Sequence, residues 1–102
     1  MLVVRDVFQA KYGRGDELVA LFKEIAEHWQ KGVHQVQLHG SRTLTDASGT
    51  FFTVVNEIEL DDFAAWQQFM VEEFAIPEFG DWFARMTPLV ESGRREFYNV
   101  VI

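Results

Sequence analysis

The hydrophobic pattern of the chain changes period several times, and each change marks a predicted element. Residues 2–10 (LVVRDVFQA) are short and rich in valine and phenylalanine, which predicts a strand largely covered on both faces. Apolar residues then recur at i, i+3, i+4, i+7 and i+11 from Leu18 to Trp29, as on one stripe of an amphipathic helix. We expect Asp16 to cap this helix and Gly32 to end it.

Residues 33–44 and 51–60 predict the two strands of an antiparallel hairpin, because turn-forming residues (TDASGT) separate them. Asp61 and Asp62 then begin a second helix, whose apolar residues keep helical spacing as far as Phe74. Pro77 ends that helix and opens a short extra one, which stops at Pro88.

The stretch 91–102 is expected to form the final strand, and Gly93 is expected to break the chain where that strand begins. It finishes on the apolar residues Val100, Val101 and Ile102. A terminus normally frays into water unless it is tied down, so we expect this one to be paired into a sheet and buried, against a second chain.

The order of elements predicts one α+β domain over residues 1–102, with a ferredoxin-like split βαβ arrangement (β-α-β-β-α-β with a short extra helix). The two βαβ halves of this arrangement form a four-stranded antiparallel sheet with its helices on one face. The first, third and fourth strands are taken to be apolar at both alternations. The open face is therefore expected to pack on a twin, giving a homodimeric α+β barrel.

Composition and charge limit the kinds of molecule that the chain is expected to bind. The 102 residues are 48% hydrophobic and 15% aromatic, a large apolar content for one small domain. The net charge of −7 argues against nucleic-acid binding, since no basic stripe is present to neutralise phosphates. The chain has no cysteine and no apolar run as long as a membrane span, and its N-terminus has no basic region followed by an apolar signal segment. We therefore expect a cytoplasmic location.

Several local motifs carry a resemblance to a known superfamily. They are Phe8, Ala10, Lys11 and Gly13 leading into the helix start, Thr53–Val55 before Glu57, and Trp82, Pro88–Val90 and Ser92–Glu96 near the end. The whole chain resembles the dimeric α+β barrel proteins, in particular the antibiotic-biosynthesis-monooxygenase-like and NIPSNAP-like members. That superfamily includes cofactor-free monooxygenases of aromatic substrates, haem-degrading enzymes and proteins with no assigned reaction. The resemblance implies a dimer with one cleft per subunit, between the sheet and its helices.

The candidate functional residues are polar or large aromatic side chains expected near such a cleft. His39 is the candidate general base, because Gln35, Gln37 and His39 share one face of a predicted strand. The candidate ligand-binding residues are Arg5, Gln37, Asn56, Trp66, Trp82 and Tyr98. We predict no metal site and no cofactor.

Each candidate also has a purely structural interpretation. His39 fits a surface position at a strand end, and the tryptophans fit a helical core. Polar strand residues can pair with each other, for example Arg5 with Glu96 or Asp6 with Arg95. His28, Glu72 and Glu73 are interpreted as residues of solvated helix faces. Asn56, Trp66 and His39 are the residue types of the haem-degrading branch, but their positions do not match it, so that triad is not transferred.

The leading hypothesis is a homodimer that binds an apolar or aromatic small molecule in a sheet–helix cleft and oxidises it without a cofactor. The alternative is a non-catalytic ligand-binding or interaction module of the same fold. A third hypothesis, a haem-binding relative, would show a Soret band on haem titration.

Overall fold

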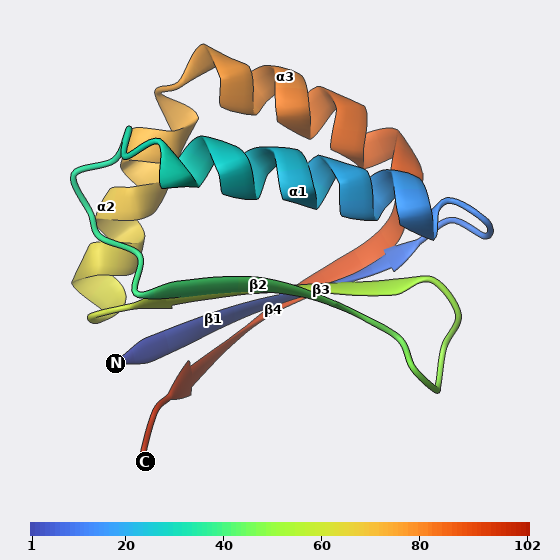
Figure 1. Ribbon diagram of the computed structural model, residues 1–102, viewed down its shortest axis with the longest axis horizontal. Coiled ribbons are helices and arrows are strands. Elements are labelled where there is room, and N and C mark those ends of the chain that lie inside the picture. Colours follow the sequence, from blue (N-terminus) through green and yellow to red (C-terminus); the bar gives the residue numbers. More distant parts are fainter.

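A computed structural model describes residues 1–102 as a four-stranded antiparallel sheet with helices on one face (Figure 1). In Figure 1, α1 and α3 run side by side over the sheet, and α2 stands at one end of the helical layer. The elements follow the order β1 (Leu2–Ala10), α1 (Gly15–Gln30), β2 (Gly40–Thr45), β3 (Thr53–Leu60), α2 (Phe63–Phe74), α3 (Pro77–Met86), a 3₁₀ turn (Thr87–Leu89) and β4 (Val90–Asn99). The strand order β2-β3-β1-β4 is that of a ferredoxin-like fold, which confirms the predicted fold class.

The core lies between the sheet and the helices. Even-numbered residues of β1 and β3 face the helical layer, as the buried Leu2, Val4, Val54 and Ile58 show. Two groups of buried residues fill this layer. One joins α1 and α3 to the sheet through Leu18, Phe22, Ile25, Trp82 and Met86, and the other gathers Leu2, Val4, Ile58, Leu60 and Phe69 beneath α2.

The open face of the sheet is more polar than the sequence pattern predicted. Glu57 pairs in register with Arg5 on one side and Arg42 on the other. Its carboxylate lies 2.6 Å from the Nε atom of each arginine, and its side chain is only 6% exposed. On β4 this face carries Arg94 and Glu96. Val3, Val7 and Val55 also lie on this face, so the expectation of apolar residues at both alternations holds only in part, because counting apolar residues along a strand overlooks the charged residues between them.

Several predicted boundaries also need correction. The second strand begins at Gly40 instead of residue 33, and the third begins at Thr53. Asp16 lies inside the first turn of α1, where Arg14 occupies the N-cap position without a side-chain hydrogen bond. By contrast, Asp62 caps α2, Pro77 opens α3 and Gly32 has a positive φ of 70°, as predicted.

Gly93 lies within β4 instead of breaking the chain before it. The strand pairing sets it opposite Phe8, on the side of the sheet that faces the helices. A Cβ atom built at Gly93 would lie 2.7 Å from the Phe8 ring. Glycine at this position therefore leaves room for an aromatic ring over the sheet.

The last three residues lie outside the sheet in the isolated chain. The Val100 N–H donates to the Met1 carbonyl oxygen over 3.0 Å, but Val101 is 91% exposed. The prediction that the whole end of the chain is paired as a strand is wrong. Its burial against a second copy remains a prediction.

Candidate functional site

A cavity of about 90 Å³ lies between the sheet and all three helices. We refer to it and its walls as the cleft. Three of its four polar residues form one row across three strands, because Asp6 of β1 is directly opposite both Asn56 of β3 and Arg95 of β4, and the fourth, Glu73, comes from α2. The remaining walls are mostly aromatic and are contributed by Phe8, Phe22, Trp29, Trp66, Phe69, Phe79, Trp82 and Phe83.

Asp6 and Arg95 hold each other in a bidentate ion pair. Arg95 Nε donates to Asp6 Oδ1 over 2.6 Å, and Nη2 donates to Oδ2 over 3.0 Å. The guanidinium carbon also lies 4.6 Å from the centre of the Trp66 ring, which is a cation–π distance. This pairing of Asp6 with Arg95 was one of the predicted structural roles, whereas Arg5 pairs with Glu57 and not with Glu96.

Hydrogen bonds fix two of the three tryptophans in the wall. Trp82 Nε1 donates to the Leu21 carbonyl oxygen over 2.6 Å, and Trp29 Nε1 donates to Glu73 Oε2 over 3.0 Å. A buried indole N–H normally needs such a partner. These hydrogen bonds therefore fix the orientation of two tryptophan side chains in the cleft wall.

Glu73 is buried inside the helical layer, which corrects its interpretation as a solvated residue. Its side chain is 1% exposed, and its Oε2 lies 2.7 Å from Nε2 of His34, whose side chain is 4% exposed. His28 is also half-buried, and its ring centre lies 6.4 Å from that of His34. Glu73 was missed although its position follows a visible signal, since it comes four residues after Phe69 and seven after Trp66 on the inward stripe of α2.

The structure divides the predicted site residues among three places. Asn56, Trp66 and Trp82 line the cleft. Gln37 and His39 line a separate depression of about 490 Å³ beside residues 34–41, where His39 Nε2 lies 2.7 Å from Asp61 Oδ1. Arg5 and Tyr98 lie together on the open face of the sheet, with the Arg5 guanidinium carbon 5.5 Å from the Tyr98 ring centre.

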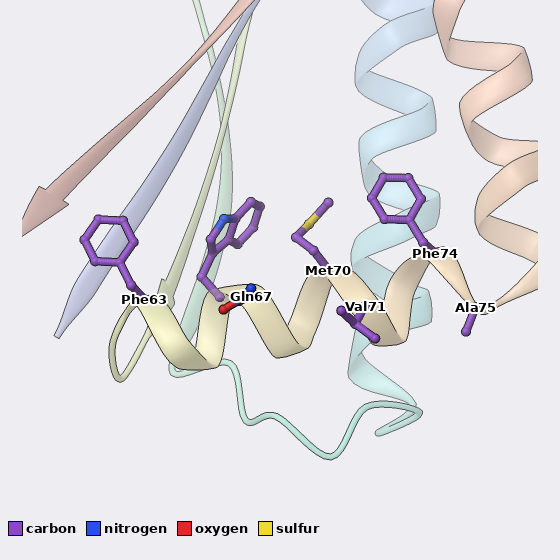
Figure 2. Close-up of a pocket in the computed structure, with 7 residues that line it drawn as sticks. Phe63, Gln67, Met70, Val71, Phe74 and Ala75 are labelled. Atoms are coloured by element: carbon purple, nitrogen blue, oxygen red, sulfur yellow. The ribbon is translucent and has the colours of Figure 1, made fainter.

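A second, more open groove follows the outer side of α2 (Figure 2). Six of its seven lining residues are hydrophobic and its volume is about 750 Å³. Phe63, Val71 and Phe74 are each more than half exposed there. Trp66 and Met70 line both this groove and the cleft, so together they separate the cleft from the surface.

The structure offers neither a cluster of metal ligands nor a membrane-spanning helix. The structure brings together no group of three histidine, aspartate or glutamate side chains able to hold a metal ion. No helix is both long enough and apolar enough to span a bilayer.

Solved structures with the same fold were found over almost the whole chain. An uncharacterised NIPSNAP domain protein from Burkholderia xenovorans superposes with a TM-score of 0.79 at 22% identity, covering 99% of this chain and 95% of its own. A NIPSNAP family protein from Agrobacterium tumefaciens gives 0.79 at 14% identity, covering 96% and 90%. An antibiotic biosynthesis monooxygenase gives 0.74 at 17% identity, covering 100% of both chains.

No protein-family model matches the sequence, and no curated protein matches it significantly. Identities of this size establish the fold and leave activity open. They agree with the resemblance found in the sequence. The chain has the fold shared by NIPSNAP domain proteins and antibiotic-biosynthesis-monooxygenase-like proteins.

Proposed function

We propose that this protein binds a small aromatic molecule in the cleft between its sheet and its helices. The observation that carries the proposal is the composition of the cleft wall, in which aromatic rings surround four polar groups: the row of Asp6, Asn56 and Arg95 on the sheet, and Glu73 on α2. Ligand sites commonly combine an apolar lining with a few polar groups that fix orientation.

An aromatic ligand requires the cleft to open. The present volume of about 90 Å³ is smaller than the roughly 150 Å³ of an apolar cavity known to hold benzene. The outer lining residues are the ones that can move, because Trp66 and Met70 are half-buried and Arg95 is exposed. Displacing these side chains joins the cleft to the groove outside α2.

Nuclear magnetic resonance with nitrobenzene as the probe tests this proposal. The side-chain amide of Asn56 and the indole N–H signals of Trp29 and Trp82 are expected to shift, because these residues line the cleft. The amide of Gln67 serves as the control, since it lines only the outer groove. Shifts confined to Gln67, or no shifts at saturating nitrobenzene, would overturn the proposal.

We propose further that the working form is a homodimer closed over the open face of the sheet. Val3, Val7, Val55 and Tyr98 remain partly exposed on that face, beside the chain of ion pairs through Glu57. The exposed apolar residues at the end of β4 lie at the margin of the same sheet. A second copy would cover both features.

Cofactor-free oxidation of the bound molecule is the more specific form of the hypothesis. Such a reaction needs a base at the ligand and exclusion of bulk water. Incubation of a bound phenol under air, followed by mass spectrometry, tests it directly. An oxygenated product that forms only with the folded protein supports the monooxygenase.

The second candidate function is a module that binds its ligand without changing it. One observation favours it: the predicted base, His39, contacts Asp61 in a loop outside the cleft. Recovery of the phenol unchanged, from a protein shown to bind it, supports this function and overturns the monooxygenase.

A further inference from the structure

Glu73 is a carboxylate placed within an aromatic environment. It is on the last turn of α2, and its side chain is 1% exposed. Its neighbours in the cleft wall include Trp29, Phe69, Phe79 and Trp82. Carboxylates are almost never fully buried unless they are paired, so its contacts need to be accounted for.

The two oxygens of Glu73 have different surroundings. Oε2 accepts the hydrogen bond from Trp29 Nε1 over 3.0 Å and lies 2.7 Å from His34 Nε2. Oε1 is buried and has no hydrogen-bond partner. A buried carboxylate oxygen without a donor is costly, and most such oxygens are bonded to something.

The His34 ring packs beside the carboxylate, with Nε2 2.7 Å from Glu73 Oε2 but without a hydrogen bond between them. The His34 ring stacks on Phe69 with centres 4.5 Å apart and planes inclined by 19°. Phe69 is itself buried, so the imidazole is fixed from below by the core. The Trp29 hydrogen bond thus fixes Oε2, beside which the His34 ring packs, and Oε1 is left as the carboxylate oxygen without a donor.

We propose that Glu73 is the specificity-determining residue of the cleft and that its Oε1 accepts a hydrogen bond from the ligand. This inference rests on the proposed binding function. It selects, among aromatic molecules, those that carry a hydroxyl or N–H donor, with phenols as the simplest class.

Calorimetric titration with 4-nitrophenol and nitrobenzene, at a mildly acidic pH that keeps the phenol protonated, tests the inference, because the two probes then differ only by a neutral hydroxyl group. The wild-type protein is expected to bind 4-nitrophenol about tenfold more tightly, the value of one charge-assisted hydrogen bond. In Glu73→Gln the preference is expected to fall about fivefold, since an amide oxygen accepts only a neutral bond. Glu78→Gln, an exposed residue of α3, is the matched control and should keep the preference.

A measurement on the wild-type protein covers the case in which Glu73→Gln does not fold. The ¹³C resonance of the Glu73 carboxyl group is expected to shift with 4-nitrophenol and to stay in place with nitrobenzene at equal occupancy. Equal affinities for the two probes, or an unmoved carboxyl resonance, would overturn the inference and leave the proposed function intact. If nitrobenzene itself does not bind, the proposed function fails and the inference fails with it.

Discussion

Glu57 shows how one buried residue can organise the open face of the sheet. Burial alone would raise its pKa, but the hydrogen bonds from Arg42 and Arg5 outweigh burial and lower the pKa below the ordinary glutamate value. Both arginines come from neighbouring strands, so the charge of Glu57 links β1, β3 and β2. One carboxylate therefore joins the ion pairs of three neighbouring strands on this face.

The lowered pKa of Glu57 predicts a pH-dependent contribution to stability. A carboxyl group whose pKa is lower in the folded state stabilises the fold at pH values above its unfolded pKa. That contribution is lost as the pH falls through the folded-state pKa, which lies below the ordinary glutamate pKa of about 4.3. Urea unfolding should show Glu57→Gln less stable than wild type at neutral pH, with a difference that shrinks on acidification. A difference independent of pH would contradict this assignment.

Gly93 gives a second prediction at the scale of one residue. Gly93→Ala places a methyl group 2.7 Å from the Phe8 ring, so the ring or the strand has to shift. We expect a loss of about 1–3 kcal/mol in the free energy of unfolding, as for other overpacked sites. Gly80→Ala is the control, because nothing lies within 4 Å of the added atom and the residue lies inside a helix. That control should be neutral or stabilising.

The candidate residues were only partly predictable from the sequence, for a physical reason. Asn56, Trp66 and Trp82 were identified because polar or aromatic residues in apolar elements usually face something specific. The pairing of Asp6 with Arg95 was predicted as a structural role, but only the strand register shows that the pair lies on the side of Leu2, Val4 and Phe8 and lines the cleft. Arg5 is one residue from Asp6 and Tyr98 is three residues from Arg95, and these odd offsets place Arg5 and Tyr98 on the opposite face of the sheet.

At the scale of elements, the segment before β2 shows where periodicity misleads. Residues 33–39 alternate like a strand but form none. Glu72 Oε1 instead accepts the backbone N–H groups of Gln35 and Val36, and His39 N–H donates to the Glu59 carbonyl oxygen. Acceptors from α2 and β3 therefore satisfy three backbone N–H groups of the segment, which a partner strand would otherwise have to satisfy. The rest of the element order followed from periodicity and capping signals.

The start of α2 offers a prediction for a whole element. Asp62 Oδ1 accepts the Ala65 N–H over 2.8 Å, so Asp62→Ala is expected to cost about 1 kcal/mol of stability. Asp16→Ala in α1 is the matched comparison, because Asp16 makes no cap and interacts only with the helix dipole. Its cost should be a few tenths of a kcal/mol. Chemical denaturation of both variants measures the difference, and equal losses would argue against the cap.

At the scale of the molecule, the open face of the sheet determines the expected assembly. We predict a dimer at micromolar concentration in sedimentation experiments. Val55→Lys places a charge at the middle of the open face and should give a monomer. Val71→Lys makes the same change on the outer side of α2, where the side chain is 68% exposed, and should remain a dimer. A wild-type monomer, or dissociation by Val71→Lys alone, would show that the sheet face is not the interface.

The placement of the tryptophans has a practical consequence. The chain has three of them, and Trp29, Trp66 and Trp82 all line the cleft. The tryptophan fluorescence of the protein therefore comes entirely from the wall of its candidate binding site. A molecule that enters the cleft changes the surroundings of every emitter at once, so libraries of unlabelled compounds can be screened by their effect on the emission spectrum.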